Sequence, residues 1–88
     1  MLCIAPHVRA SVHSDGVALL NIASGKLFLC NETGSQIWQG IAQGLSPEVI
    51  VERISREADV GWELVERHTS LFLAELERRG LVVRKQEC

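Results

Sequence analysis

The chain has 88 residues, which is enough for one domain with one modest hydrophobic core. Its formal net charge of -2 at pH 7 argues against a surface that binds nucleic-acid phosphates, because such surfaces are normally basic. No apolar run approaches the ~20 residues of a membrane-spanning helix, and residues 1–5 are too short for a secretion signal. We therefore predict one domain over residues 1–88 that binds neither nucleic acid nor a membrane.

The three cysteines, Cys3, Cys30 and Cys88, are widely spaced and include no Cys-x-x-Cys pair. This pattern fits a reducing interior better than a disulfide framework, so we expect a cytoplasmic protein. Cys3 and Cys88 are expected to be exposed and without a role. Residues 1–6 are expected to form a loose arm.

The first third of the chain predicts an antiparallel meander of three strands. Residues 8–13 alternate apolar and polar side chains, which is the pattern of a half-buried strand. Asp15-Gly16 predicts a tight hairpin turn, since glycine reaches the positive φ that such turns require. Residues 17–22 form the second predicted strand, and residues 26–30 form the third.

The third predicted strand is apolar on both faces. Leu27, Phe28, Leu29 and Cys30 are four consecutive apolar residues. A surface strand of a small sheet usually alternates, with apolar side chains toward the core and polar ones toward water. This strand therefore needs cover on both faces and along its edge.

Three helices are predicted after the strands. Asn31 suits the N-cap of the first helix, because its side-chain oxygen can accept a backbone N–H of the first turn. Ser46-Pro47 starts the second, with serine as N-cap and proline at the first helical position. The third runs from about residue 62 to residue 79 and ends at Gly80. The stripes that face the core are Ile37, Trp38, Ile41, Ala42 and Leu45 in the first helix, and Val49, Ile50, Ile54 and Ala58 in the second.

The third helix has a wider apolar surface than a core-facing stripe requires. Its inner face is centred on Val65, Thr69, Phe72, Leu73 and Leu76. A second row on one flank consists of Leu64, His68, Leu71 and Glu75. Three strands followed by three helices with short connections predict an α+β, winged helix-turn-helix-like fold. The third strand and the third helix are expected to leave a groove between them.

No residue pattern predicts catalytic or metal chemistry. His7, His13 and His68 are scattered and do not pair with cysteines or carboxylates at ligand spacing. Nothing near Cys30 in the sequence would lower its thiol pKa, so Cys30 is expected to be a small buried apolar residue. His68 is either a hydrogen-bonding group in the groove or a half-solvated boundary residue. We therefore predict no cofactor, no metal and no catalytic residue.

Two runs of residues resemble the PqqD-like family. The opening run is Leu20-Asn21 … Gly25 … Cys30-Asn31-Glu32-Thr33-Gly34 … Ile37-Trp38, and the closing run is Phe72-Leu73-Ala74-Glu75-Leu76 … Gly80-Leu81-Val82. The likeness covers about residues 8–83, which we take as the core of the domain. Residues 41–44 stand in place of the Cys-Asp-Gly run of PqqD proper. Thr33-Gly34 with Trp38 is closer to the stand-alone recognition proteins of lasso-peptide pathways.

The resemblance implies a recognition element for ribosomally made, post-translationally modified peptides (RiPPs), which is not an enzyme. Such a domain binds the leader segment of a precursor peptide as an added strand beside the third strand, with the third helix behind it. It delivers the leader to a protease or another modifying enzyme, here most simply in lasso-peptide biosynthesis. The alternative is a peptide chaperone for a radical-SAM enzyme, in pyrroloquinoline quinone or another RiPP pathway. The implied peptide-binding residues are Lys26, Leu27, Phe28, Leu29, Cys30, Leu64, His68, Leu71, Phe72 and Glu75.

The sequence leaves two points of this site open. It does not decide whether Leu27 or Phe28 points into the groove, because a shift of one residue reverses every side chain of a strand. The surface between the third strand and the third helix is, alternatively, ordinary core without a groove.

Two other classes of protein are disfavoured. A winged-helix DNA-binding module shares the architecture, but it needs a cationic recognition helix. The third helix instead carries Glu63, Glu66, Glu75 and Glu77 against Arg67, Arg78 and Arg79. A small enzyme is disfavoured because no acid and base are paired.

Overall fold

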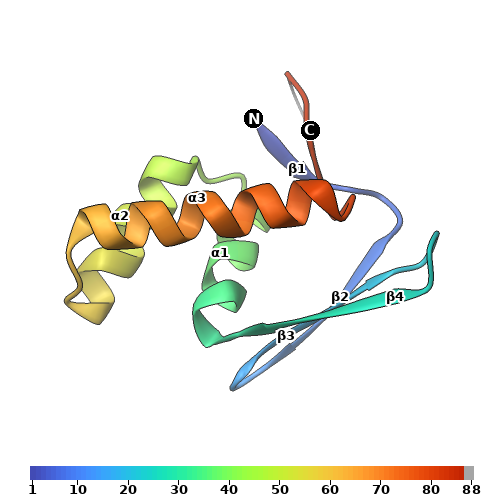
Figure 1. The fold of residues 1–88 in the computed structure, drawn as a ribbon, viewed down its shortest axis with the longest axis horizontal. Helices are drawn as coiled ribbons and strands as arrows, with labels where there is room; N and C mark the ends of the chain where they lie inside the picture. Colours follow the sequence, from blue (N-terminus) through green and yellow to red (C-terminus); the bar gives the residue numbers. More distant parts are fainter. Residues whose placement is uncertain (87–88) are drawn as a thin grey trace.

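The computed structural model describes residues 1–86, which form three α-helices and two small sheets (Figure 1). The strands are β1 (Leu2–Ile4), β2 (Val8–His13), β3 (Gly16–Asn21), β4 (Lys26–Asn31) and β5 (Val82–Arg84). The helices are α1 (Glu32–Ala42), α2 (Pro47–Ala58) and α3 (Trp62–Arg78). An antiparallel sheet of order β2-β3-β4 is followed by the three helices, which confirms the predicted α+β fold. No helix of the described residues is long and apolar enough to cross a membrane.

The three-stranded sheet has an inner face toward the helices. The register between β3 and β4 pairs Leu19 with Phe28 and Val17 with Cys30 on this face. Val17 and Leu19 are buried in the core. Gly16 starts β3 with a φ of 156°, and a Cβ at this position would lie 2.0 Å from the carbonyl oxygen of Cys30. Only glycine fits at this turn, which confirms the hairpin predicted from Asp15-Gly16.

The helix starts and stops follow the local sequence. Asn31 Oδ1 accepts the backbone N–H of Gly34 at 2.9 Å and so caps α1. Ser46 Oγ accepts the backbone N–H of Val49 at 3.3 Å and so caps α2. Gly80 follows α3 with a φ of 71°, which is the left-handed conformation expected at a helix end. These predicted boundaries are therefore confirmed.

The buried face of α2 differs from the prediction. The helix buries Ile50, Val51 and Ile54, whereas Val49 and Ala58 are exposed. The predicted stripe is wrong at these two positions because α2 packs against both α1 and α3. A helix that packs against two neighbours buries the side chains that lie between them, so its buried stripe is shifted from the one expected for a single neighbour.

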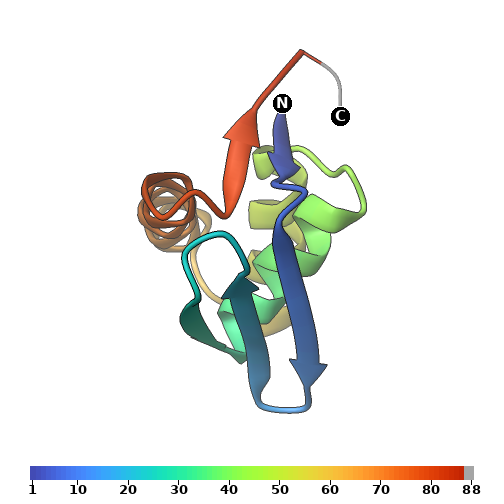
Figure 2. The same cartoon turned by 90° about the vertical axis from the view of Figure 1, so that its right-hand side faces the viewer.

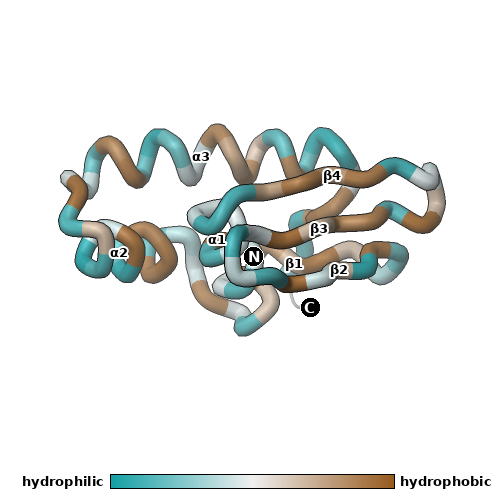
Figure 3. The backbone as a smooth tube through the Cα atoms, turned by 90° about the horizontal axis from the view of Figure 1, so that it is seen from below, coloured by the Kyte–Doolittle hydropathy of each residue, from teal (hydrophilic) through white to brown (hydrophobic). Residues whose placement is uncertain are grey.

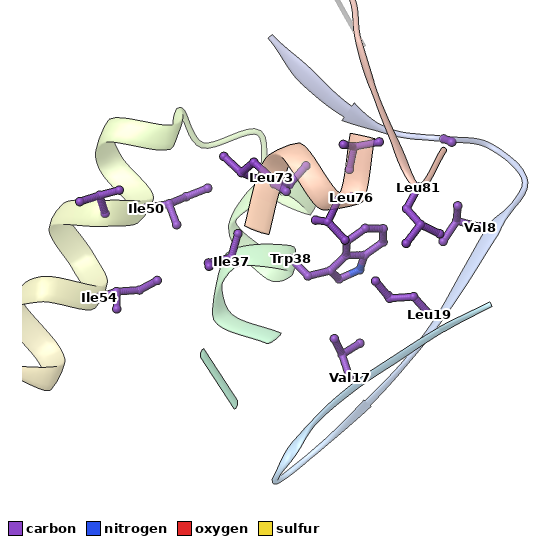
Figure 4. Packing of buried hydrophobic residues seen from close by; sticks show 14 of the residues in the cluster. Val8, Val17, Leu19, Ile37, Trp38, Ile50, Ile54, Leu73, Leu76 and Leu81 are labelled. Atoms are coloured by element: carbon purple, nitrogen blue, oxygen red, sulfur yellow. The ribbon is translucent and has the colours of Figure 1, made fainter. Parts of the chain in front are cut away.

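The core lies between the sheet and the helices and has Trp38 at its centre. The Trp38 side chain is 3% exposed, and its ring lies close to Leu19, Leu76 and Leu81 (Figure 4). This confirms the predicted core role of Trp38. The further buried hydrophobic residues of the cluster are Ala5, Val8, Val17, Ile37, Ile41, Ile50, Val51, Ile54, Val65, Leu73 and Val82.

The first residues form a strand, so the prediction of a loose arm is wrong. β1 pairs antiparallel with β5, and the two lie side by side where both termini emerge (Figure 2). The backbone N–H of Ala5 also bonds the carbonyl of Leu81 at 3.1 Å. Because the partner strand lies at the other end of the chain, no local pattern signals this pairing.

The expectation of an exposed, idle Cys3 is wrong as well. Cys3 is 5% exposed and disulfide-bonded. The disulfide bond of Cys3 therefore does not support the reducing compartment that we inferred from the spacing of the cysteines. Cys88 lies outside the described residues.

Candidate functional site

One edge of the three-stranded sheet is open beside α3. Within residues 1–86, β4 pairs with β3 on one side and with no strand on the other. Helix α3 runs along the β4 side of the sheet rather than over β2 (Figures 2 and 3). An edge strand presents alternate N–H and C=O groups that another extended chain can bond. β4 and α3 therefore frame a place where such a chain could lie.

Three hollows follow one another along α3, and we call them together the β4–α3 groove: the first two lie beside β4, and the third lies between α3 and residues of α1 and α2. The start hollow, about 310 Å³, is lined by residues that include Lys26, Phe28, Arg78 and Arg79. The middle hollow, about 240 Å³, is lined by residues that include Thr33, Gly34, His68 and Phe72. The far hollow, about 150 Å³, is lined by residues that include Ile37, Ile54, Ala58, Val60, Leu64 and His68. The predicted groove is therefore present, and the alternative of a continuous core at this surface is wrong.

Two aromatic rings bridge the strand and the helix at the floor of the groove. The rings of Phe28 and Phe72 meet edge to face, with centroids 6.2 Å apart and an interplanar angle of 65°. Gly34 lets the start of α1 approach this floor. A Cβ there would lie 2.8 Å from Cβ of Cys30 and 3.1 Å from the Phe72 ring, so any side chain would push the floor apart.

The structure decides which β4 side chains face the helices. Phe28 and Cys30 are half-buried and point inward, whereas Leu27 and Leu29 lie on the outer face and are 59% and 72% exposed. Lys26 is exposed at the start of the strand. Of the predicted strand residues, Lys26, Leu27 and Phe28 line the start hollow together with Arg78 and Arg79. Cys30 faces inward beside Gly34, and Leu29 lies on the outer face of the free edge.

The predicted α3 residues are spread along the groove rather than gathered. Leu64 and His68 line its far part, and Phe72 lines its middle. Glu75 lies near the start hollow and binds two arginines. Leu71 is 66% exposed and points more toward solvent than the others.

Several groove-lining residues were not assigned to the site from the sequence, among them Thr33, Arg78 and Arg79. Thr33 lines both the middle and the far hollow, and it stands inside the Thr-Gly motif of the opening run. Arg78 and Arg79 line the start hollow. Their spacing of three and four residues from Glu75 places them on the same flank of the helix, which is the signal that could have found them.

The charged side chains near the start hollow hydrogen-bond to one another. Arg79 Nε donates to Glu75 Oε2 at 2.8 Å, and Arg78 donates to the same oxygen. The hydrogen bond from Arg79 is the main reason that the pKa of Glu75 is lowered, so this carboxyl stays ionised. The Arg79 guanidinium also lies over the Phe28 ring, 4.5 Å from its centroid.

The groove offers no activated nucleophile in the described residues. Burial raises the pKa of the Cys30 thiol to about 11, so at neutral pH the sulfur is protonated and unreactive. No group of three or more His, Cys, Asp or Glu residues within residues 1–86 could hold a metal ion. The free edge of β4 and the hollows beside it are suited to contacting an extended chain.

The fold and the groove define a small α+β domain with one open sheet edge beside a helix. The chain belongs to the PqqD family, because the family model described as "Coenzyme PQQ synthesis protein D (PqqD)" matches residues 16–82. No curated protein matches the chain.

Two solved structures are similar to this chain. One, described as "TbiB1 in Complex with the TbiA(beta) Leader Peptide", has 32% sequence identity and a TM-score of 0.89, and the match covers 97% of this chain and 99% of that one. Another, described as "Lasso peptide synthetase B1 complexed with the leader peptide", has 23% identity and a TM-score of 0.86, with 94% and 98% covered. The second supports the fold alone, while the first is a relative over nearly the whole chain.

Proposed function

We propose that this chain is a RiPP recognition protein that binds the leader segment of a precursor peptide as a strand added to β4. The observation that carries the proposal is the bare apolar edge of β4 next to the groove beside α3. TbiB1, the relative with 32% identity, was solved in complex with a leader peptide. That complex supports the same ligand class for this chain.

Affinity and specificity arise from different parts of this site. Ladder hydrogen bonds to the backbone of β4 bind any extended chain, and they carry little sequence preference. Side-chain hollows beside the strand then select among peptides. We propose the peptide-binding set as Lys26, Leu27, Phe28, Leu29, Cys30, Leu64, His68, Leu71, Phe72 and Glu75. Phe28 and Cys30 act from the groove floor, and Leu27 and Leu29 act from the outer face of the edge.

The proposed role is delivery rather than catalysis. The domain, spanning residues 1–88 with a core at about 8–83, holds the leader while a protease or another modifying enzyme acts on the attached peptide. Lasso-peptide biosynthesis is favoured by Thr33-Gly34 with Trp38, which resembles the stand-alone recognition proteins of lasso-peptide pathways, together with the leader-bound relative at 32% identity. We place this role in the cytoplasm, where the ribosome makes the precursor.

The second candidate is a peptide chaperone in pyrroloquinoline quinone synthesis, which the description of the family model favours. Gene neighbours separate the two. A precursor reading frame beside a transglutaminase-like protease and an asparagine-synthetase-like cyclase indicates a lasso peptide, whereas a radical-SAM enzyme indicates the alternative.

A proline scan of the leader tests strand addition. The probe is a fluorescein-labelled peptide covering the leader of the short precursor encoded beside the gene for this chain. Each proline removes one N–H, so affinity is expected to fall about two- to tenfold at alternate positions only, where the N–H faces β4. The measurement is fluorescence anisotropy, with a scrambled leader as control. A flat profile, or one with the three-to-four-residue rhythm of a helix, contradicts strand addition.

A further inference from the structure

The start hollow of the β4–α3 groove has more positive than negative charge. Lys26, Arg78 and Arg79 line it. Glu75 is the one carboxylate that ion-pairs with these arginines within residues 1–86, and it serves both of them. Lys26 forms no ion pair in the same part of the chain. Three cationic groups thus face one carboxylate at this end of the groove.

Arg79 is held in place before any ligand arrives. Its guanidinium lies 4.5 Å from the centroid of the Phe28 ring, and its Nε is bound to Glu75 at 2.8 Å. Within the described part of the chain its Nη atoms make no hydrogen bond, so they remain available as donors. A planar cation held in this way suits a carboxylate, because little side-chain freedom is lost on binding.

The opposite end of the groove has different chemistry. The far hollow is lined mainly by aliphatic side chains, among them Ile37, Ile54, Val60, Leu64 and Val65. The Phe28 and Phe72 rings lie between the two ends. The groove is therefore apolar at one end and cationic at the other.

We propose that the start hollow is a carboxylate-binding subsite that accepts an acidic side chain of the bound leader. This inference rests on the proposed function, since it names the chemistry that the same groove selects. Lys26 supplies an ammonium that no carboxylate of residues 1–86 neutralises, and Arg79 supplies oriented guanidinium donors. Glu75 is a positioning residue that keeps Arg79 over Phe28.

The two ends of the groove set a spacing in the leader. Side chains of an added strand face the helices at every second residue, and each residue advances ~3.3 Å. Arg78 and Arg79 lie about twelve positions along α3 from the α3 residues that line the far hollow, which is ~18 Å of helix. For a leader that stays extended past the end of β4, the acidic and the apolar residue are thus an even number of positions apart, about six. Strand addition antiparallel to β4, which continues the pattern of the sheet, places the acidic residue C-terminal to the apolar one.

Binding of leader variants tests the subsite. The probe is the fluorescein-labelled leader of the neighbouring precursor, made as a C-terminal amide so that its end carboxylate cannot bind in place of a side chain. Each Asp or Glu is replaced singly by Asn or Gln. One replacement, at the predicted position, is expected to weaken binding about fivefold, and added salt should shrink this difference. The peptide with a free C-terminal carboxylate is measured alongside and should bind equally well.

Charge reversal on the protein gives the matched experiment. The Lys26→Glu variant is expected to bind the unaltered leader more weakly than the wild type does. It should bind more tightly to a leader in which the critical acidic residue is replaced by Lys. Lys85→Glu makes the same charge change at the chain's other lysine, away from the groove, and should leave binding unchanged. Melting temperatures of both variants establish that they fold.

The outcomes separate the inference from the proposed function. Two results would overturn the carboxylate subsite while leader recognition stands. In the first, the unaltered leader binds and every Asn or Gln replacement leaves its affinity unchanged. In the second, the Lys26→Glu variant binds the unaltered leader as tightly as the Lys85→Glu variant does. A preference for the free C-terminal carboxylate overturns the side-chain assignment. If the unaltered leader does not bind at all, the proposed function fails and the inference fails with it.

Discussion

The two edges of the three-stranded sheet are built in different ways. On β2, the outer face carries Arg9, Ser11 and His13, and these polar groups bond one another or the adjacent backbone. Arg9 Nη1 donates to the carbonyls of Pro6 and Val8 at 3.3 and 3.2 Å. Ser11 Oγ and His13 Nε2 lie 2.9 Å apart. These side chains make β2 a poor template for another strand.

The β4 edge has no such protection beyond Lys26 at its start. Leu27 and Leu29 are exposed on the outer face, and Phe28 and Cys30 are half-buried on the inner face. Natural proteins usually blunt exposed edges with charge, proline or bulges, because a flat apolar edge invites pairing. One sheet with one blunted and one bare edge indicates that the bare edge is kept for a partner strand.

The largest expected effect concerns the core that both edges share. Trp38→Ala should lower the free energy of unfolding by ~3–5 kcal/mol, because the buried indole would leave a cavity beneath the sheet. Urea denaturation of the wild type and of Trp38→Ala measures this loss. Trp62→Ala is the matched control: Trp62 is 47% exposed, so its loss should be well under half as large. Equal effects of the two substitutions would show that Trp38 does not anchor the sheet.

The sequence predicts those parts of the fold that local chemistry decides. The Asp15-Gly16 turn, the Asn31 and Ser46 caps and the Gly80 stop each depend on one or two neighbouring residues, and all are confirmed. The β1–β5 pair was missed because its two strands come from opposite ends of the chain. Pairing at that separation leaves no periodic trace in either segment.

The groove was predicted as a place, but its side chains were not all assigned. An apolar run on both faces of β4 signalled an unusual edge, yet it could not give the register. Pairing with Leu19 on β3 decides that Phe28, not Leu27, faces the helices. The stacking of Arg79 on Phe28 joins residues far apart in sequence, so composition and spacing carry no sign of it.

A smaller expected effect, on leader affinity, compares the two edges directly. Leu29→Lys gives β4 the kind of charge that blunts an edge, and Val12→Lys places the same charge at an exposed apolar position of β2, on the opposite face of the sheet. Leu29 and Val12 are 72% and 55% exposed, so neither change should alter stability by more than ~0.5 kcal/mol. Leader affinity should fall about fivefold for Leu29→Lys, since an apolar cross-strand contact is lost. Val12→Lys should leave it unchanged.

Anisotropy titrations of the two lysine variants against the same labelled leader measure this difference. Urea curves for each variant establish that both remain folded under the assay conditions. Equal weakening by both substitutions would mean that the leader does not distinguish the edges. Weakening by Val12→Lys alone would move the site to β2.

The smallest expected effect is a pH dependence that belongs to β4 alone. Cys30 pairs across the sheet with Val17, whose other neighbour is Val12 on β2, so the same row ends in a titratable thiol on one edge and an alkyl group on the other. Burial raises the pKa of the Cys30 thiol from 9.0 to about 11, so the folded state holds this proton more tightly than the unfolded chain does. This contribution to stability is complete below pH 9 and is lost as pH rises through 11.

Urea denaturation of the wild type and of Cys30→Ala at about pH 8 and about pH 10.5 isolates the thiol from the other groups that titrate in this range. The wild type is expected to lose more stability between the two pH values than Cys30→Ala does, and the difference should be small because the thiol is only half-buried. Bound leader would cover the thiol further and enlarge the difference. If both proteins lose the same stability, the thiol is as well solvated in the folded chain as in the unfolded one, and the groove floor is more open to water than Phe28 and Phe72 suggest.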